Sequence, residues 1–209
     1  WGGRIEEGYP INSLWGYQLG GIFQSEQDVL DYQATTEDKI ATSQHAGDMW
    51  FKDVNGPPDE NHRFYTPGPD GVVDNFDRTY LGKTIPGFFY GLNFTIEYQG
   101  IDLACYFTGV GDVERINNVR ANLESMSSRG VNQLSSVEDR WTATNHSTTM
   151  PRAAAADPGA NNRFSDRWIE NASYFRLANL QVGYTLPKFN TKVFDRARIW
   201  VGGSNLFTA

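Results

Sequence analysis

The chain has 209 residues, of which 14% are aromatic, 21% are charged and 21 are glycine, and its formal net charge is −7. This charge argues against nucleic acid as a partner, because nucleic-acid binding calls for a clustered basic face. The single cysteine, Cys105, excludes an internal disulfide and a multi-thiolate metal site. No window approaches the roughly 18 apolar residues of a membrane-spanning helix, and the start of the chain does not resemble a signal peptide. Enrichment in aromatic residues and glycine favours β structure.

The first expected strand covers residues 12–23, which are dense in Trp, Tyr, Leu and Gly. The clearest strand is residues 92–99, where apolar and polar side chains alternate with period 2. The alternation restarts after Gln99-Gly100 and continues over residues 101–108. These two strands are therefore predicted to form a hairpin with a tight turn.

Two further strands follow at residues 179–186 and, more weakly, at 198–206, and Pro187 ends the first of them because it cannot donate to a ladder. The connections are very unequal, since the segments 24–86 and 112–172 are long. Long structureless loops are uncommon in compact domains. Outer-membrane barrels, in contrast, combine short periplasmic turns with long extracellular loops.

The alternation also predicts two faces of the sheet. In a barrel the apolar set faces lipid and the polar set faces the lumen, and aromatic residues gather at both ends of the predicted strands, as in the two aromatic belts of such barrels. A soluble β-sandwich explains the alternation equally well but not the belts or the unequal loops. The expected lipid-facing residues are Leu92, Phe94, Ile96, Leu180, Val182 and Leu186, and the expected lumen-facing residues are Asn93, Thr95, Glu97, Asn179 and Gln181.

Several ordered motifs resemble those of one family. They are Pro10–Tyr17, Gly47-Asp48, Asp53–Gly56, Asp70–Val73, Asp77-Arg78, Ser165–Leu177, Gly183–Pro187 and Ser204–Thr208. Together they resemble the C-terminal part of SusC/RagA-type TonB-dependent outer-membrane transporters, over nearly the whole chain. The sequence departs from this family at residues 57–69, which split a loop that its members usually keep continuous.

The resemblance implies an all-β fold, an antiparallel transmembrane β-barrel of about 22 strands of which this chain supplies roughly the last five or six. Residues 1–209 would form the C-terminal portion of the barrel, with extracellular loops at 24–86 and 112–172, and the plug domain would lie outside this chain. Counting strand directions from the Gln99-Gly100 turn leaves the strand at 198–206 running outward. We therefore expect the full-length protein to continue past Ala209 with one more loop and one inward strand, because an open edge is not tolerated in lipid.

No catalytic constellation is apparent, and the protein is not expected to be an enzyme. The histidines His45, His62 and His146 are scattered. Asp166 and Glu170 form a carboxylate pair of the kind used in glycoside hydrolysis, but hydrogen bonding within their turn is the preferred interpretation. Loop aromatics are candidates for stacking on sugar rings or filling peptide side-chain pockets. These candidates are Trp50, Phe51, Phe64, Tyr65 and Trp141.

One aspartate-rich loop is a candidate calcium site, because its acidic residues are spaced like the ligands of a calcium loop once residues 57–69 loop out. Carboxylates in such turns also cap backbone amides without metal, so both interpretations stay open. The candidate ligands are Asp53, Asn55, Asp70, Asp74 and Asp77.

The function implied by the resemblance is TonB-dependent import of an oligosaccharide or a peptide across the outer membrane of a Gram-negative bacterium. The implied partners are a SusD-like surface lipoprotein, the outer-membrane lipid and, through the absent N-terminal part, TonB. The alternative is a soluble all-β module that binds or processes glycans. Extraction in plain buffer would favour the module, whereas a need for detergent would favour the barrel.

Overall fold

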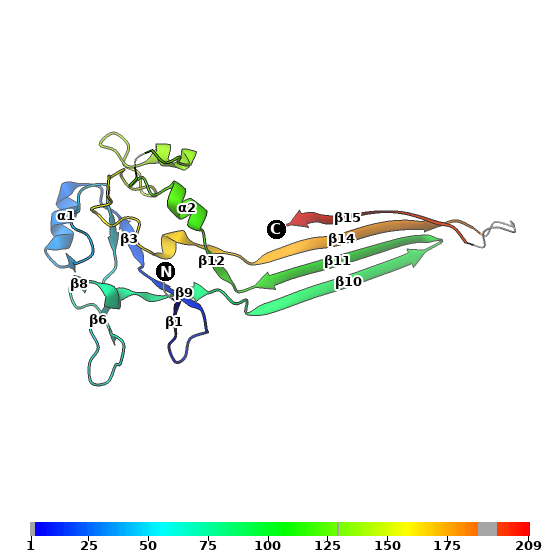
Figure 1. Cartoon of the computed structure of the whole chain (residues 1–209), viewed down its shortest axis with the longest axis horizontal. Coiled ribbons are helices and arrows are strands. Elements are labelled where there is room, and N and C mark those ends of the chain that lie inside the picture. Colours follow the sequence, from blue (N-terminus) through cyan, green and yellow to red (C-terminus); the bar gives the residue numbers. More distant parts are fainter. Residues whose placement is uncertain (1–2, 129, 188–195) are drawn as a thin grey trace. The chain divides into compact units, whose positions relative to one another are not determined.

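The computed structural model describes residues 3–128, 130–187 and 196–209 (Figure 1). They form two compact units. Unit 1 comprises Trp1–Lys83 and Arg115–Glu170, and unit 2 comprises Thr84–Glu114 and Asn171–Ala209. Within the described ranges, no helix has both the length and the apolar character needed to cross a membrane.

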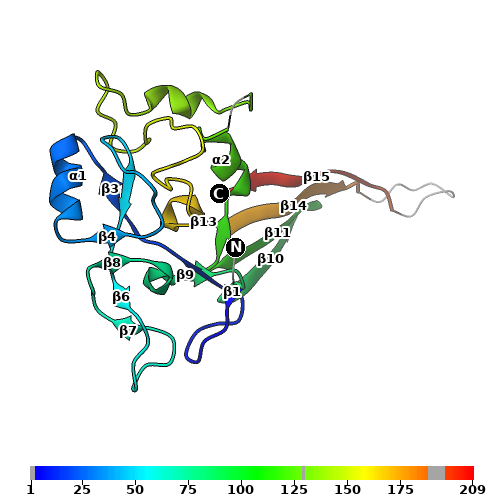
Figure 2. The same cartoon turned by 60° about the vertical axis from the view of Figure 1, so that its left-hand side comes forward.

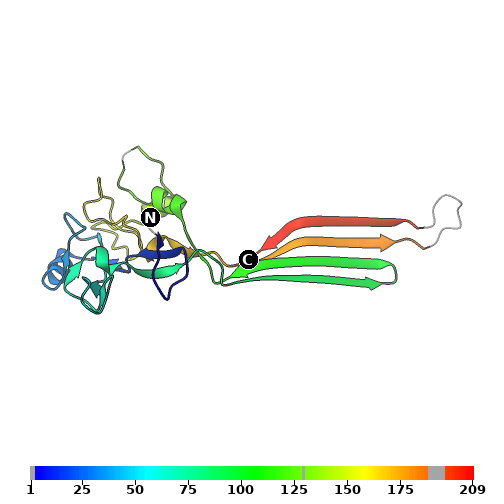
Figure 3. The same cartoon turned by 60° about the horizontal axis from the view of Figure 1, so that its bottom comes forward.

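Unit 2 is a sheet of four long antiparallel strands in the order β10-β11-β14-β15 (Figures 1 and 3). The hairpin expected at Gln99-Gly100 is confirmed, since both residues have positive φ, 49° and 84°, and join two strands directly. Two positive φ values are the mark of the tight turn whose twist matches that of the strands. The strands are β10 (Phe88–Tyr98), β11 (Ile101–Gly111), β14 (Tyr174–Thr185) and β15 (Arg198–Thr208).

The register gives the sheet one apolar and one polar face, because directly opposed residues share a face. An irregularity at Leu177/Asn179 skips one residue of β14. Without that skip, Leu177 would point to the polar face, since a shift of one residue exchanges the faces. The apolar face carries Phe88, Tyr90, Leu92, Phe94, Ile96, Tyr98, Ile101, Leu103, Cys105, Phe107, Phe175, Leu177, Leu180, Val182, Tyr184, Ile199, Val201 and Phe207.

Unit 1 is built from short elements (Figure 2). Its strands pair as β1-β2-β9, β3-β5, β6-β7 and the parallel pair β4-β8, and β12 pairs with β13 where the chain crosses between the two units. The strands are β1 (Gly3–Arg4), β2 (Ser13–Gly16), β3 (Leu19–Ile22), β4 (Glu37–Asp38), β5 (Met49–Phe51), β6 (Asn55–Gly56), β7 (Thr66–Pro67), β8 (Val72–Val73), β9 (Thr79–Lys83), β12 (Glu114–Ile116) and β13 (Ile169–Asn171). The helices are α1 (Glu26–Gln33), α2 (Asn118–Leu123) and the 3-10 turns η1 (Asn75–Asp77), η2 (Ser135–Asp139) and η3 (Asp166–Trp168).

The prediction that residues 12–23 form one strand of the barrel is wrong. This stretch is divided into β2 and β3, which pair with strands of unit 1, and the sheet of unit 2 has four strands in the described residues rather than five or six. The physical reason is burial, since all four residues of β2 are buried. A strand of a barrel wall exposes one side to lipid, whereas β2 is enclosed on both sides.

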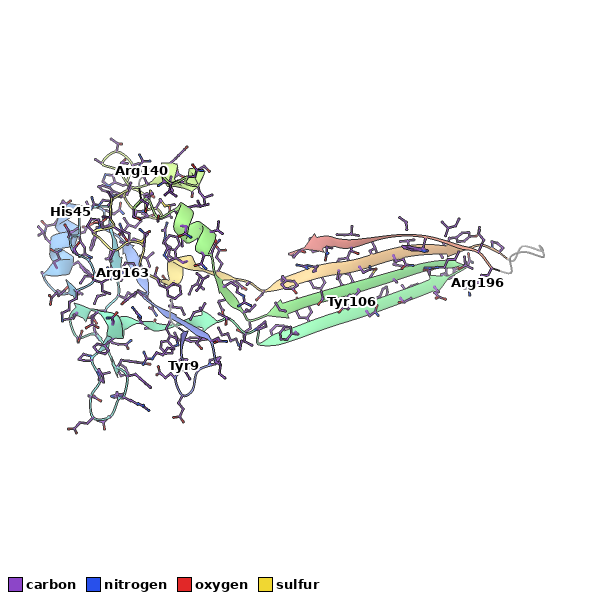
Figure 4. All side chains as sticks on the ribbon, in the orientation of Figure 1. Tyr9, His45, Tyr106, Arg140, Arg163 and Arg196 are labelled. Carbon is purple, nitrogen blue, oxygen red and sulfur yellow. The ribbon has the colours of Figure 1, made fainter. Side chains whose placement is uncertain are left out.

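The core of unit 1 surrounds a buried ion pair. Tyr17, Ile22, Met49, Phe51 and Val73 pack together. Arg163, labelled in Figure 4, reaches into this cluster, with its guanidinium carbon 4.2 Å from the centre of the Phe51 ring, and forms a 2.7 Å salt bridge to Asp38. A charge this deeply buried is retained only when it is paired.

The segments expected as long loops, 24–86 and 112–172, contain secondary structure and packed side chains. Helix α1 begins with a capping box, in which the Ser25 hydroxyl accepts from the Asp28 amide and the Asp28 carboxylate accepts from the Ser25 amide. The 112–172 segment has its own small cluster of Met126, Val137 and Met150. The extracellular placement of the segments 24–86 and 112–172 stays a prediction.

Candidate functional site

The apolar face of the unit 2 sheet is uncovered. Leu92 is 58% exposed, Phe94 is 44%, Ile96 is 48% and Val182 is 41%. A contiguous apolar surface of this kind is rare on soluble monomers and marks a surface that meets protein or membrane. Side chains project from both faces along the strands (Figure 4).

The division of the strand residues predicted from the sequence is confirmed, because the two expected sets lie on opposite faces. Leu92, Phe94 and Ile96 share their face with Leu180 and Val182 through the register of β10, β11 and β14. The expected lumen-facing residues lie on the other face, and Leu186 follows the end of β14. The opposite-face set is Asn93, Thr95, Glu97, Asn179 and Gln181.

Aromatic rings gather at the end of the sheet near Phe88. The Phe107 and Phe175 rings stack 5.2 Å apart, and Tyr90 lies 6.2 Å from Phe175. Tyr98 and Tyr184 lie at the opposite end, next to the Gln99-Gly100 turn. The two aromatic zones expected from the sequence are present along the strands.

The polar face carries an ion pair that sequence reasoning missed. Arg198 of β15 donates through Nε to Asp102 Oδ1 at 2.8 Å, and a second contact joins its Nη2 to Oδ2. The pair passes over Gly183 of the intervening strand, where an added Cβ would come within 2.4 Å of Asp102 Oδ1. The alternation in the sequence places Asp102 and Arg198 on the polar face. Only the register of the strands shows that their ion pair spans the intervening strand β14.

The loop aromatics proposed from the sequence do not form one site. For Phe51 the prediction is wrong, because its side chain is fully buried in the core of unit 1. Trp141 packs against that core and covers Gly47, where an added Cβ would lie 2.4 Å from its ring. Phe51 and Trp141 therefore stabilise the fold of the loops. Of the three candidate aromatics Trp50, Phe51 and Trp141, only Trp50 is left as a candidate for contact with the substrate.

Phe64 and Tyr65 belong to a separate cluster around Arg4. The guanidinium carbon of Arg4 lies 4.7 Å from the Phe64 ring centre, 5.0 Å from that of Tyr65 and 4.8 Å from that of Trp15, and its Nε contacts Glu6 at 2.9 Å. Burial raises the pKa of Tyr65 to about 12. These cation–π contacts tie the inserted hairpin of β6 and β7 to the first residues of the chain.

Trp50 lines an open hollow of about 480 Å³ in unit 1. Its ring lies 5.8 Å from that of Tyr32, at 49° between the planes. Burial raises the pKa of Tyr32, and its hydroxyl donates to the Phe51 carbonyl at 2.9 Å. The other lining residues are Thr35, Thr36, Phe51, Lys52, Asp53, Val54, Pro69 and Gly71.

Four of the five expected calcium ligands, the aspartates, act as acceptors for backbone amides, whereas Asn55 donates through Nδ2 to the Phe76 carbonyl at 3.1 Å. Asp77, fully buried, accepts from the amides of Val54, Asn55 and Asp74 at 2.7–3.0 Å. Burial raises the pKa of its carboxyl. Asp53 accepts from the amides that follow in the second half of the loop, and Asp70 and Asp74 each accept from an amide two residues on.

These bonds leave no convergent ligand set. In residues 3–128, 130–187 and 196–209, no group of three His, Cys, Asp or Glu side chains is arranged to hold a metal ion. In this arrangement the residues Asp53, Asn55, Asp70, Asp74 and Asp77 are hydrogen-bonded to the backbone of the loop, and the calcium interpretation stays a prediction. Turn-forming carboxylates satisfy amides in the same way without any ion.

The carboxylates of the most distinctive motif also act in folding. Asp166 accepts from the Leu19 amide at 3.0 Å and its own amide donates to the Tyr17 carbonyl. Glu170 accepts from the Asn117 side chain at 3.1 Å. Both carboxylates thus hydrogen-bond to the fold, but the prediction that they bond within their own turn is wrong, because their partners Leu19 and Asn117 lie far away in the sequence.

Comparisons with known proteins point to one kind of transporter, although no protein-family model matches the chain. The chain is 28% identical over 206 residues to TonB-dependent receptor P3 of Formosa agariphila, covering 98% of this chain and 18% of that protein. It is 25% identical over 205 residues to TonB-dependent receptor P26 of the same organism, covering 97% of this chain and 19% of that protein. The chain resembles a segment of a SusC/RagA-type TonB-dependent transporter. It spans about a fifth of the length of these relatives.

Solved structures show the fold. The RagAB peptide importer in its closed-closed state matches with a TM-score of 0.70 and 23% identity, covering 98% of this chain and 20% of that one. Its open-open state matches with a TM-score of 0.65 and 22% identity, covering 97% and 19%. The chain therefore shares the fold of a segment of these structures, and the antiparallel sheet of unit 2 agrees with the barrel fragment that the resemblance implied.

Proposed function

We propose that the full-length protein imports a nutrient, an oligosaccharide or a peptide, across the outer membrane of a Gram-negative bacterium in a TonB-dependent manner. The observation that carries this proposal is the uncovered apolar face of the four-stranded sheet, with Leu92 58% and Val201 71% exposed. In a barrel wall that face meets lipid while the polar face lines the lumen. Both the similar receptors and the RagAB structures support it.

The same proposal assigns the partners. Unit 1 would lie outside the membrane and meet the substrate and a SusD-like surface lipoprotein, and TonB would act through a part of the protein outside this chain. A soluble glycan-binding or glycan-processing module is less well supported, because the apolar face of the sheet stays exposed among the described residues of unit 2. The carboxylates Asp166 and Glu170, which such an enzyme would need free, hydrogen-bond to the fold.

Cell fractionation and uptake test the proposal together. The full-length protein is expected in the outer-membrane fraction, released by detergent and not by plain buffer. Cells carrying it are expected to take up a fluorescent oligosaccharide pool or a fluorescent peptide pool, and to stop when a protonophore collapses the inner-membrane gradient. Recovery in the soluble fraction, or uptake that ignores both gene deletion and the protonophore, contradicts it.

A further inference from the structure

The ring of Trp50 is seated on a pair of glycines. It covers Gly20 and Gly21 of the neighbouring strand β3, and an added Cβ at Gly20 would lie 2.0 Å from the ring. The register pairs Gly21 with Trp50 directly. Adjacent glycines weaken a strand and mark positions where another group approaches closely. Because Gly20 and Gly21 have no side chains, the Trp50 ring can pack directly against the backbone of β3.

The same ring forms a wall of the hollow of about 480 Å³. Tyr32, Thr35, Thr36, Lys52 and Asp53 also line it, and the Thr35 hydroxyl donates to the Tyr32 carbonyl at 3.1 Å. This is the make-up of a small-molecule site, an apolar surface with a few polar groups, and the volume is within the usual range of roughly 300–1,000 Å³. A pyranose ring presents an apolar C–H face and a rim of hydroxyl groups, which match an indole face and a polar rim.

The edge of β5 beside the hollow does not suit an extended peptide. Peptides that add to a sheet gain affinity from free main-chain groups of the edge strand. Here the Met49 amide donates to the Asn161 side chain at 2.7 Å, and the Phe51 carbonyl accepts from the Tyr32 hydroxyl at 2.9 Å. Two edge groups that a peptide would use are therefore occupied by side chains.

Hydrogen bonds join one wall of the hollow to a neighbouring loop. Asp53 accepts from the amides of Asp70 and Gly71 at 3.2 and 2.6 Å, which ties one wall to the loop after it. A preformed site avoids the entropic cost of ordering loops on binding. We infer that this hollow is a sugar-binding subsite in which Trp50 stacks on a pyranose ring of the imported nutrient, an inference that rests on the proposed function.

The test uses the full-length protein in detergent, an array of defined neutral and acidic oligosaccharides, and an array of peptides from a protein digest. Titration calorimetry with the strongest array oligosaccharide then compares variants. Trp50→Ala is expected to weaken sugar binding roughly tenfold or more, since an aromatic platform contributes both area and ring contact, and Trp50→Phe to weaken it less. Leu30→Ala, at an exposed apolar residue of unit 1 outside the hollow, is expected to leave affinity unchanged.

A further variant guards against misfolding of Trp50→Ala. Thr35→Arg places a longer side chain at the exposed rim and is expected to weaken sugar binding while Trp50 stays seated. Unchanged sugar affinity in both Trp50→Ala and Thr35→Arg overturns the inference. Capture of peptides and of no oligosaccharide by the wild-type protein also overturns it, yet leaves import intact. Protonophore-insensitive uptake, in contrast, is the separate failure of the proposed function.

Discussion

The two units of the chain encode their structures differently. In unit 2 the information is local, because each strand carries its own alternation and the register only aligns faces that already exist. In unit 1 the information is distant in sequence, since Asp38 pairs with Arg163 and Asp48 with Arg152. The fold of unit 2 follows from a repeating pattern of apolar and polar residues, whereas the fold of unit 1 depends on individual buried polar contacts. The effect of a substitution on stability should therefore depend in unit 2 on the face of the sheet that carries the residue. In unit 1 it should depend on the partner that the residue contacts.

The largest expected effect is the loss of a buried partner in unit 1. The Arg163 and Asp38 side chains are 4% and 1% exposed. Arg163→Met leaves the carboxylate buried without its partner, and we expect a cost of about 3–5 kcal/mol. Amide hydrogen exchange of the full-length protein should show faster exchange in unit 1 and unchanged exchange in the sheet.

Arg140 provides the matched control. It is exposed and donates to a nearby carbonyl within its own turn, so Arg140→Met is expected to change stability by no more than about 0.5 kcal/mol. Equal exchange in both variants would show that the buried pair does not organise unit 1.

The next effect tests the two faces of unit 2. Phe94→Arg puts a charge on the apolar face in the middle of β10, and we expect a cost of about 2–4 kcal/mol in a bilayer. Thr95→Arg, its neighbour on the polar face, should cost far less. Urea unfolding of the full-length protein in lipid measures both, and equal costs would contradict the assignment of the faces.

The sheet could be predicted from the sequence because period 2 is a local signal. The hairpin at Gln99-Gly100 and both faces followed from it. The stretch 12–23 was misassigned because Trp, Tyr and Leu favour strands in any environment, and its division at Tyr17, which pairs with Ser165, depends on a contact far along the chain. The seat of the Trp50 ring had a signal in Gly20-Gly21, but the ring that covers them could not be identified without the pairing of β3 and β5.

A third prediction decides between amide capping and metal in the aspartate loop. Asp77→Ala leaves three amides without their acceptor, and we expect a loss of roughly 1–3 kcal/mol for unsatisfied buried donors. The control Asp70→Ala removes one amide contact from an exposed residue and should cost less. Because the carboxylates are used by amides, adding calcium or a chelator should leave the thermal stability of unit 1 unchanged. A rise in stability with calcium would support the metal interpretation.

The smallest effect concerns the cap of α1, a local signal inside unit 1. Ser25→Ala removes the hydroxyl that accepts from the Asp28 amide, and we expect a cost of about 1 kcal/mol at neutral pH. Gln33→Ala in the same helix is the control, since the propensities of the two residues are similar. Hydrogen exchange of the α1 amides measures both variants.

The pH dependence of this cap has a defined sign. The hydrogen bond with Ser25, followed by that with the Gln24 amide, lowers the pKa of Asp28 from its ordinary 3.8. A carboxyl whose pKa is lowered on folding contributes stability above its unfolded pKa and loses it as the pH falls through the folded value. Because Ser25→Ala removes the largest cause, the difference between wild type and variant should be full above pH 3.8 and shrink below it. A difference that grows on acidification would show that the helix is held by its packing and not by its cap.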